Sequence, residues 1–195
     1  ITRCLMMLGF YAVQPYILYY LADVVRVEKP ASQSANVMAV ILLTATVSGL
    51  LGGKLSDRTG RKPIVLWSSI LIAVCCLAFI GVRSMTPMLL LGAVFGLGYG
   101  AYLSVDWALG ADVLPRQEDA GKDMAVWHVA MTLPQQVSPL IAGLMLDANR
   151  QGTRIIDDGK EVASYALAGY AAVFGMAAVL FFLGGYWSRH VRGAR

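Results

Sequence analysis

Six long apolar runs, separated by short polar stretches, make up almost the whole chain. Each run is long enough to form a transmembrane helix, because a bilayer core about 30 Å thick requires about 20 apolar residues. The pattern therefore predicts six membrane-spanning helices in one domain of 195 residues. These spans are expected at about residues 4–23, 35–53, 64–82, 88–109, 124–146 and 164–187.

The composition is that of a membrane protein. Charged residues make up only 14% of the chain and hydrophobic residues 57%, whereas soluble globular domains carry about 25% charged residues. A soluble core could not cover this much apolar surface without long polar faces, which the sequence lacks. The longest connection, residues 147–163, is polar and is expected to be a solvated loop. We therefore predict an all-α, polytopic membrane protein.

The 16 Lys and Arg residues lie mostly between the apolar runs. This distribution does not indicate nucleic-acid binding, which requires basic residues along one face. Basic residues resist translocation across the membrane, and most of them share one side if the amino end is cytoplasmic. We expect a multi-pass protein of the cell membrane with both termini cytoplasmic. The chain begins at Ile1, almost inside an apolar run and without a Met, which suggests a fragment of a longer protein.

The sequence offers little for catalysis or metal binding. Cys4, Cys75 and Cys76 lie within apolar runs and lack the spacing of metal ligands or of a disulfide framework. No zinc-protease, serine-hydrolase or phosphate-loop motif is present, and the chain contains only 2 histidines. We therefore expect no enzyme activity, no metal and no cofactor.

Small residues recur along one side of the fourth apolar run. Gly92, Gly96, Gly100 and Ser104 follow one another at intervals of four residues, so they form one ridge on a helix. Such a ridge lets the backbone of a second transmembrane helix come close. The segment GLGYG within it is not a nucleotide-binding turn, because that turn follows a strand and opens a soluble helix. We interpret the ridge as a helix-packing surface.

A second, polar face of the same run carries Tyr99, Tyr102 and Asp106. An acid inside a membrane helix is costly and normally faces a partner or a water-filled cavity. A simpler interpretation is that the span ends early and leaves the Asp106 carboxylate at the membrane interface. His128 lies near the start of the fifth run at a similar depth, so Asp106 and His128 could form a protonatable pair. The alternative for His128 is a packing role.

The first and fifth runs carry further polar residues. In the fifth run, His128, Gln135 and Pro139 share one helix face, which is typical of a cavity lining. In the first run, Gln14 lies at mid-depth near Tyr11. An amide at this depth requires a partner, and together with the aromatic ring it could bind a polyol.

The segment GKLSDRTGRK, residues 53–62, concentrates charge between the second and third runs. It resembles, position for position, the signature G-x-L-[SA]-D-[RK]-x-G-[RK]-[RK] of the major facilitator superfamily. The resemblance implies one of two six-helix halves, each made of two inverted three-helix repeats. It also implies a cytoplasmic gating latch in which acid, basic residues and glycines act together. The latch residues are Gly53, Asp57, Arg58, Gly60, Arg61 and Lys62.

Two further segments are similar to the carboxy-terminal half of bacterial members near the glycoside and sucrose-type cation symporters. They are DWALGADVLP and GKDMAVWHVAMTLPQQVSPLIAG. The resemblance implies that the first and fourth spans line the central cavity. The candidate substrate-binding residues are then Tyr11, Gln14, Tyr102, Asp106 and Gln135, and the candidate proton-coupling residues are Asp106 and His128.

The resemblance predicts half of a secondary active transporter that moves a small, sugar-like polar solute by alternating access. The coupling ion would be H⁺ or Na⁺. Further partners would be the lipid bilayer and either a missing amino-terminal six-helix half or a second copy of the chain. Export of drugs or metabolites by a protein of the same superfamily is the nearest alternative. A non-transporting membrane receptor or scaffold with the same fold is another.

Overall fold

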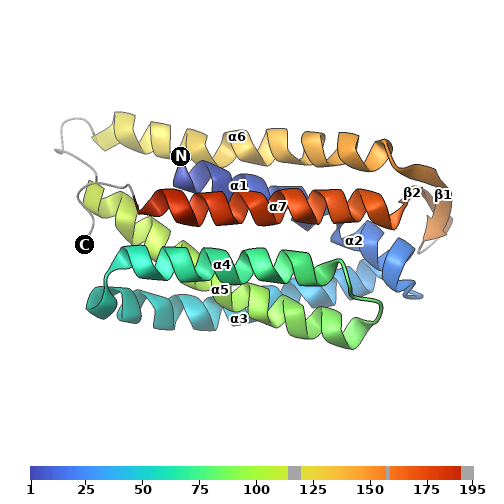
Figure 1. The fold of residues 1–195 in the computed structure, drawn as a ribbon, viewed down its shortest axis with the longest axis horizontal. Coiled ribbons are helices and arrows are strands. Elements are labelled where there is room, and N and C mark those ends of the chain that lie inside the picture. Colours follow the sequence, from blue (N-terminus) through green and yellow to red (C-terminus); the bar gives the residue numbers. More distant parts are fainter. Residues whose placement is uncertain (114–119, 157–158, 190–195) are drawn as a thin grey trace.

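The computed structural model describes residues 1–113, 120–156 and 159–189. Six helical stretches within these residues are long and apolar enough to cross a membrane, which confirms the predicted all-α, six-span architecture. They lie side by side along the long axis of the molecule (Figure 1). Their bounds are Thr2–Val25, Pro30–Ser56, Arg61–Phe79, Met85–Ala108, Met124–Asp147 and Leu167–Ser188.

The first span is interrupted near its middle. It consists of α1 (Thr2–Val13), a 3-10 turn η1 (Gln14–Tyr16), α2 (Ile17–Tyr20) and a π-helical turn η2 (Leu21–Val25). The 3-10 turn contains Pro15, which lacks a backbone donor and crowds the preceding turn. The break therefore lies within a run that the sequence predicted as one continuous helix.

The other spans are α3 (Pro30–Thr59), α4 (Arg61–Phe79), α5 (Met85–Val113), α6 (Ala120–Asp147) and α7 (Leu167–Ser188). The sequence placed the end of the second span at residue 53, whereas α3 continues through most of the charged signature segment. Only Gly60 separates α3 from α4. Its φ of 88° and ψ of 158° lie in a backbone region that is essentially restricted to glycine.

The longest connection forms a β-hairpin where the sequence predicted a solvated loop. β1 (Arg150–Ile156) pairs antiparallel with β2 (Lys160–Tyr165). Because β2 includes residues 164 and 165, α7 begins at Leu167 and not at the predicted residue 164. The hairpin closes one end of the helix bundle, and the α3–α4 junction lies at the opposite end (Figure 1). We call these the hairpin end and the signature end.

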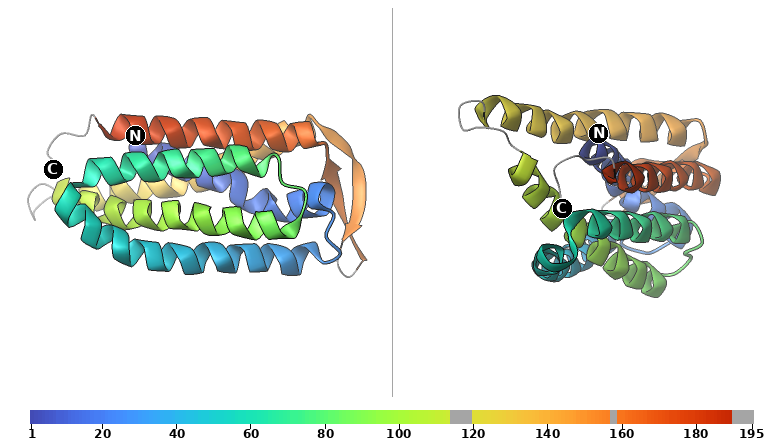
Figure 2. Two further views of the ribbon diagram at one scale, coloured as in Figure 1. Left: turned by 60° about the horizontal axis from the view of Figure 1, so that its bottom comes forward. Right: turned by 60° about the vertical axis from the view of Figure 1, so that its left-hand side comes forward.

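The two halves of the chain pack in matching ways. In one set of contacts, α3 and α4 both pack against α5. In the matching set, α6 and α7 both pack against α1. α4 and α7 also contact each other, as Figure 2 shows. Exchanging α1, α3 and α4 with α5, α6 and α7 therefore reproduces the same set of contacts, as expected of two three-helix repeats.

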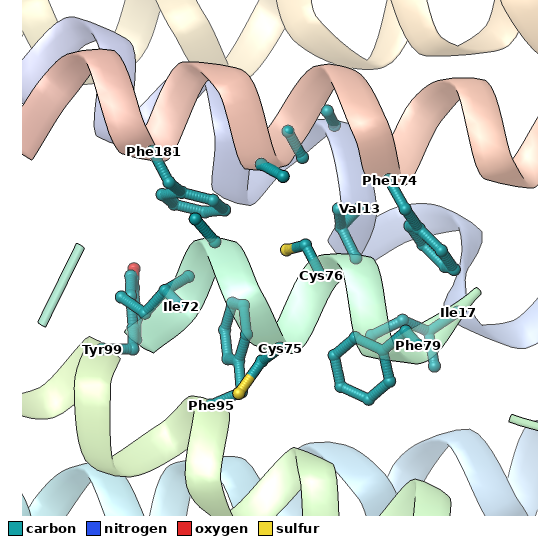
Figure 3. Close-up of a cluster of buried hydrophobic side chains, with 14 of the residues drawn as sticks. Val13, Ile17, Ile72, Cys75, Cys76, Phe79, Phe95, Tyr99, Phe174 and Phe181 are labelled. Atoms are coloured by element: carbon teal, nitrogen blue, oxygen red, sulfur yellow. The ribbon is translucent and has the colours of Figure 1, made fainter. Parts of the chain in front are cut away.

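Aromatic side chains fill the centre of the bundle (Figure 3). Phe79 of α4, Phe95 of α5, and Phe174 and Phe181 of α7 are almost fully buried. The ring centre of Phe95 lies 6.2 Å from that of Phe79 and 6.1 Å from that of Phe181. Aromatic pairs at this spacing attract one another beyond their area of burial. These contacts join α4, α5 and α7 into one core.

The helices α3 and α6 form the flanks of the bundle. In the most apolar 18 residues of α3 and of α6, only 22% of the residues are buried, compared with 44–50% in the other spans. Large apolar side chains remain exposed on both flanks, among them Leu42 and Leu50 of α3 and Leu140 and Leu144 of α6. These surfaces are suited to contact with lipid or with another apolar helix.

Candidate functional site

A buried ion pair joins the first helices of the two repeats. The Nη1 atom of Arg3 in α1 donates to Oδ2 of Asp106 in α5 over 2.6 Å. Tyr102, one helical turn before Asp106, donates its hydroxyl to Oδ1 over 3.1 Å. The side chains of Arg3 and Asp106 are each only 5% exposed. Both oxygens of the carboxylate are therefore occupied by donors from this chain.

Two indole rings enclose the Arg3 guanidinium. Its Cζ atom lies 5.0 Å from the ring centre of Trp107 and 4.3 Å from that of Trp127, within the range of cation–π attraction. Nη2 donates to the sulfur of Met131 at 3.5 Å, which is a weak acceptor. The buried Nε has no hydrogen-bond partner among the described residues. The guanidinium is thus held by one strong acceptor and by aromatic faces from α5 and α6.

Reasoning from the sequence identifies Asp106 but misses Arg3. Arg3 precedes the predicted start of the first span at residue 4, so the sequence groups it with the basic residues that set topology. α1 instead begins at Thr2, which places Arg3 inside the helix and against α5. A general signal could have found it, because an acid inside a membrane span normally has a basic partner on another span.

The structure does not bring His128 to Asp106. His128 is exposed on α6, and its Nδ1 atom lies 3.1 Å from the carbonyl oxygen of Met124, one turn earlier in the same helix. Arg3, and not the predicted His128, is the partner beside the Asp106 carboxylate. Asp106 itself is 4% exposed, so it does not lie at a solvated helix end.

The other predicted cavity residues lie apart from the ion pair. Tyr11 is half-buried on α1. Gln14 is exposed beside the 3-10 break, where it lines a hollow of about 250 Å³ against α3. Gln135 is exposed on α6. Of the predicted substrate-binding residues, the structure therefore brings only Tyr102 and Asp106 into direct contact among the residues it describes.

A groove of about 380 Å³ runs between α3 and α5. Its wall includes Tyr99, whose ring stacks on Phe10 of α1 with the ring centres 4.3 Å apart. It also includes Trp107, whose ring contacts Arg3. The groove and the ion pair therefore share a wall and form one candidate site. The larger side chains that line the groove are Leu42, Leu50, Tyr99, Leu103 and Trp107.

The wall of this groove depends on the glycine ridge of α5. A Cβ atom at Gly100 would lie 2.0 Å from the carbonyl oxygen of Ala45, and one at Gly96 would lie 2.0 Å from Oγ1 of Thr44. Gly92 has more room, because its nearest neighbouring atoms would lie 3.6 Å away. The ridge thus faces α3, and Gly96 and Gly100 are the positions where the two helices approach most closely.

Comparison with known proteins places the chain in a family. Residues 1–195 match the Major Facilitator Superfamily. The chain belongs to this superfamily. It is 34% identical over 116 residues to the minor myo-inositol transporter IolF of Bacillus subtilis (strain 168), which covers 58% of this chain and 26% of that protein. It is 30% identical over 128 residues to multidrug resistance protein D of Escherichia coli (strain K12), with 64% and 32% covered.

A third relative is the chloramphenicol resistance protein CraA of Acinetobacter baumannii, 28% identical over 117 residues, or 60% of this chain and 28% of that protein. The matched part of the chain spans between 26% and 32% of the length of these three relatives. The six helices of membrane-spanning length and the superfamily match together establish a multi-pass membrane protein. The relatives are named for transport of myo-inositol and for resistance to drugs.

The superfamily signature lies at the α3–α4 junction. Gly53 faces α5, where a Cβ atom would lie 3.0 Å from a serine Oγ. Arg58 is exposed at the end of α3, and Arg61 and Lys62 are half-buried at the start of α4. The side chain of Asp57 lies outside the described residues, so its role in the latch stays a prediction. The segment is helical on both sides of Gly60.

Replacing Gly60 by alanine is expected to lower the free energy of unfolding by about 1–3 kcal/mol, the usual cost of a residue held in a sparsely populated backbone region. Thermal unfolding of the purified protein in detergent, followed by circular dichroism, measures the change. Gly121→Ala is the control, because a Cβ atom at this helical glycine would meet no atom within 4 Å. An unchanged melting temperature for Gly60→Ala would contradict the conformation at this junction.

Proposed function

We propose that the chain is the carboxy-terminal six-helix half of a secondary active transporter that moves a small, sugar-like polar solute by alternating access. The observation that carries this proposal is the buried Arg3–Asp106 pair, because it joins the first helix of one repeat to the first helix of the other. Movement of one repeat against another opens and closes the path to a solute site in such transporters. A charged pair at this contact links that movement to an ion.

Protonation of Asp106 couples the movement of the repeats to a proton. A neutral Asp106 leaves the charge of Arg3 uncompensated in a buried site, which is strongly unfavourable. Proton binding therefore favours a state in which Arg3 has moved away, and the ionised acid favours the closed pair. A proton fits this site better than Na⁺, because both carboxylate oxygens already have donors. His128 stays a second candidate for proton transfer from its exposed position on α6.

The exposed flanks fit a second six-helix unit. The apolar side chains on α3 and α6, such as Leu50 and Leu144, are more than half exposed, and the relatives are much longer than this chain. A missing amino-terminal half, or a second copy of the chain, covers part of these flanks in the working transporter. The signature end is cytoplasmic because basic residues gather there.

A polyol or a sugar is the first candidate solute. One relative is named as a myo-inositol transporter, and hydroxyl groups require hydrogen-bond partners inside the cavity. Tyr11 offers a ring and a hydroxyl, and Gln14 and Gln135 offer amides. Together with Tyr102 and Asp106, these residues form the proposed cavity lining once the second half is in place.

Asp106→Asn in the full-length transporter is expected to abolish accumulation of solute against its gradient while leaving slow equilibration intact, since the proton no longer biases the α1–α5 contact. The measurement is uptake of radiolabelled myo-inositol into reconstituted vesicles under an imposed pH gradient. The double variant Arg3→Gln/Asp106→Asn leaves no buried charge unpaired, and the same loss of accumulation is expected. Glu28→Gln, which changes an exposed acid outside the spans, serves as the control.

Two results would change this assignment. Accumulation of myo-inositol by Asp106→Asn at the level of the parent protein would remove the coupling role of this residue. Accumulation driven by a Na⁺ gradient alone would replace the proton with Na⁺. Each result leaves the superfamily assignment intact, because that rests on the match over residues 1–195.

Export of an apolar drug is the second candidate function. It is favoured by the groove between α3 and α5, whose wall is mostly apolar and includes the rings of Tyr99 and Trp107. Two relatives are named for multidrug and chloramphenicol resistance. Chloramphenicol resistance in cells that express the full-length protein, without uptake of myo-inositol, would favour export over import.

A further inference from the structure

The hairpin end holds a second buried carboxylate, which the proposed coupling does not use. Asp23 lies in the π-helical turn at the end of the first span, and its side chain is 4% exposed. Its Oδ2 atom accepts the Tyr170 hydroxyl at 2.6 Å and the Tyr165 backbone N–H at 2.9 Å. Its Oδ1 atom accepts the Ser164 hydroxyl at 2.7 Å and lies 3.5 Å from Nε of Arg154. The acceptor capacity of a carboxylate, about four positions, is thereby filled.

Other contacts hold the same end of the span on its remaining sides. The Tyr20 hydroxyl lies 2.6 Å from the carbonyl oxygen of Phe79 and 2.8 Å from that of Val82, at the end of α4. Arg154 of β1 also donates through Nη1 to the carbonyl oxygen of Ala22 at 2.8 Å. The end of the first span is thus attached to α4, to the hairpin and to the start of α7.

A merely solvated loop would leave these charged groups in water. Instead, the hairpin delivers a hydroxyl, a backbone N–H and a guanidinium to one buried acid, and α7 adds a phenol. Withdrawing these donors would leave the carboxylate buried and short of partners, which is strongly unfavourable. The attachment therefore persists through any movement that leaves the hairpin end folded.

We infer that Asp23 is a positioning residue for transport. With Arg154, Ser164 and Tyr170 it forms a clasp that makes the hairpin, the end of the first span and the start of α7 move as one body. This inference rests on the proposed function, because the Arg3–Asp106 pair lies near the other end of the same span. With the span fixed to α7 at the hairpin end, movement between the repeats separates α1 from α5 at the opposite end, where the Arg3–Asp106 pair lies. A span with a loose end would instead absorb that movement at the 3-10 break.

Asp23→Asn in the full-length transporter is expected to lower the maximal transport rate about tenfold and to leave KM within about twofold, since hydrogen bonds to a charged group are lost away from the solute. Tyr170→Phe removes one donor and should give an intermediate loss. Glu161→Gln is the matched control, because Glu161 is bonded to Thr153 within the same hairpin and no described contact joins it to the first span. A parental rate for Asp23→Asn, or a rise in KM alone, would overturn the inference.

A second measurement tests whether the clasp holds the hairpin in place, and it requires no solute. A nitroxide label is attached at Ile155→Cys, a position that is 72% exposed on β1, in a full-length protein freed of its other cysteines. Asp23→Asn should increase the mobility of this label in the electron paramagnetic resonance spectrum, and Glu161→Gln should not. Unchanged mobility would overturn the clasp. If the parent protein transports no solute, the proposed function fails while this spectrum still tests the clasp.

A reversible cross-link tests whether the contact between Asp23 and Ser164 stays closed during transport, as a clasp requires, or opens in each cycle. Asp23→Cys and Ser164→Cys, introduced together in the cysteine-free protein, replace the hydrogen bond between these side chains with a disulfide. The oxidised protein is expected to transport at nearly the parental rate, and reduction should lower the rate to that of Asp23→Asn. Transport that is blocked by oxidation and restored by reduction would show that this contact must open in each cycle, which overturns the inference.

Discussion

Replacing Gly100 by alanine is expected to destabilise the protein strongly. The added Cβ atom would lie 2.0 Å from the carbonyl oxygen of Ala45 and 2.6 Å from its carbonyl carbon. These are backbone atoms, so no change of rotamer relieves the clash and α3 must move away from α5. Overpacking costs about 1–3 kcal/mol and occasionally more, and we expect a loss at the upper end. Thermal unfolding in detergent, followed by circular dichroism, measures it.

Gly175→Ala is the matched control for this variant. Gly175 also lies inside a transmembrane helix, but a Cβ atom there would meet no atom within 4 Å. Alanine favours a helix over glycine by about 1 kcal/mol, so this variant should be at least as stable as the parent protein. Gly92→Ala should fall between the two, because its nearest neighbours are at ordinary contact distance. Equal melting temperatures for Gly100→Ala and Gly175→Ala would show that α3 and α5 do not approach this closely.

Arg3→Gln is expected to lower the free energy of unfolding by about 3–5 kcal/mol, the usual cost of removing one partner of a buried ion pair. The variant leaves the Asp106 carboxylate buried, with the Tyr102 hydroxyl of α5 as its remaining hydrogen-bond donor among the described residues. Trp107 and Trp127 flank the guanidinium, so tryptophan fluorescence reports the change at the site itself. Unfolding of the purified protein followed by this fluorescence gives the midpoint shift.

A double-mutant cycle tests whether Arg3 and Asp106 stabilise each other. Asp106→Asn alone should also be costly, because it leaves the guanidinium uncompensated between two indole rings. The double variant Arg3→Gln/Asp106→Asn should recover part of the loss, since no unpaired charge remains buried. Simple addition of the two single losses would contradict the interaction between these side chains.

The helical spans could be predicted because hydrophobic length is a property of each apolar run by itself. The ends of the elements could not, because they depend on more than hydropathy. The charged residues after Gly53 are compatible with a helix, so α3 continues until Gly60 breaks it. The β-branched residues near Ile155 and Val162, on either side of the sequence Asp-Asp-Gly, were an available signal for a hairpin.

Only part of the candidate site could be predicted from the sequence. Asp106 and Tyr102 stand out because polar residues are rare in apolar runs and a one-turn spacing places them on one face. Arg3 lies 103 residues from Asp106, and no periodicity relates positions so far apart. For the same reason the role of Asp23 could not be predicted, since its partners lie more than a hundred residues away along the chain.

The sequence by itself determined the six spans, the glycine ridge of α5 and the signature at the α3–α4 junction. Each of these is a local pattern, readable from the period and chemistry of neighbouring residues. Only the tertiary structure decided that the ridge faces α3, that Arg3 neutralises Asp106 and that the hairpin is fastened to Asp23. These outcomes depend on which helices lie side by side, because a buried charge is stabilised by whatever partner the packing brings to it.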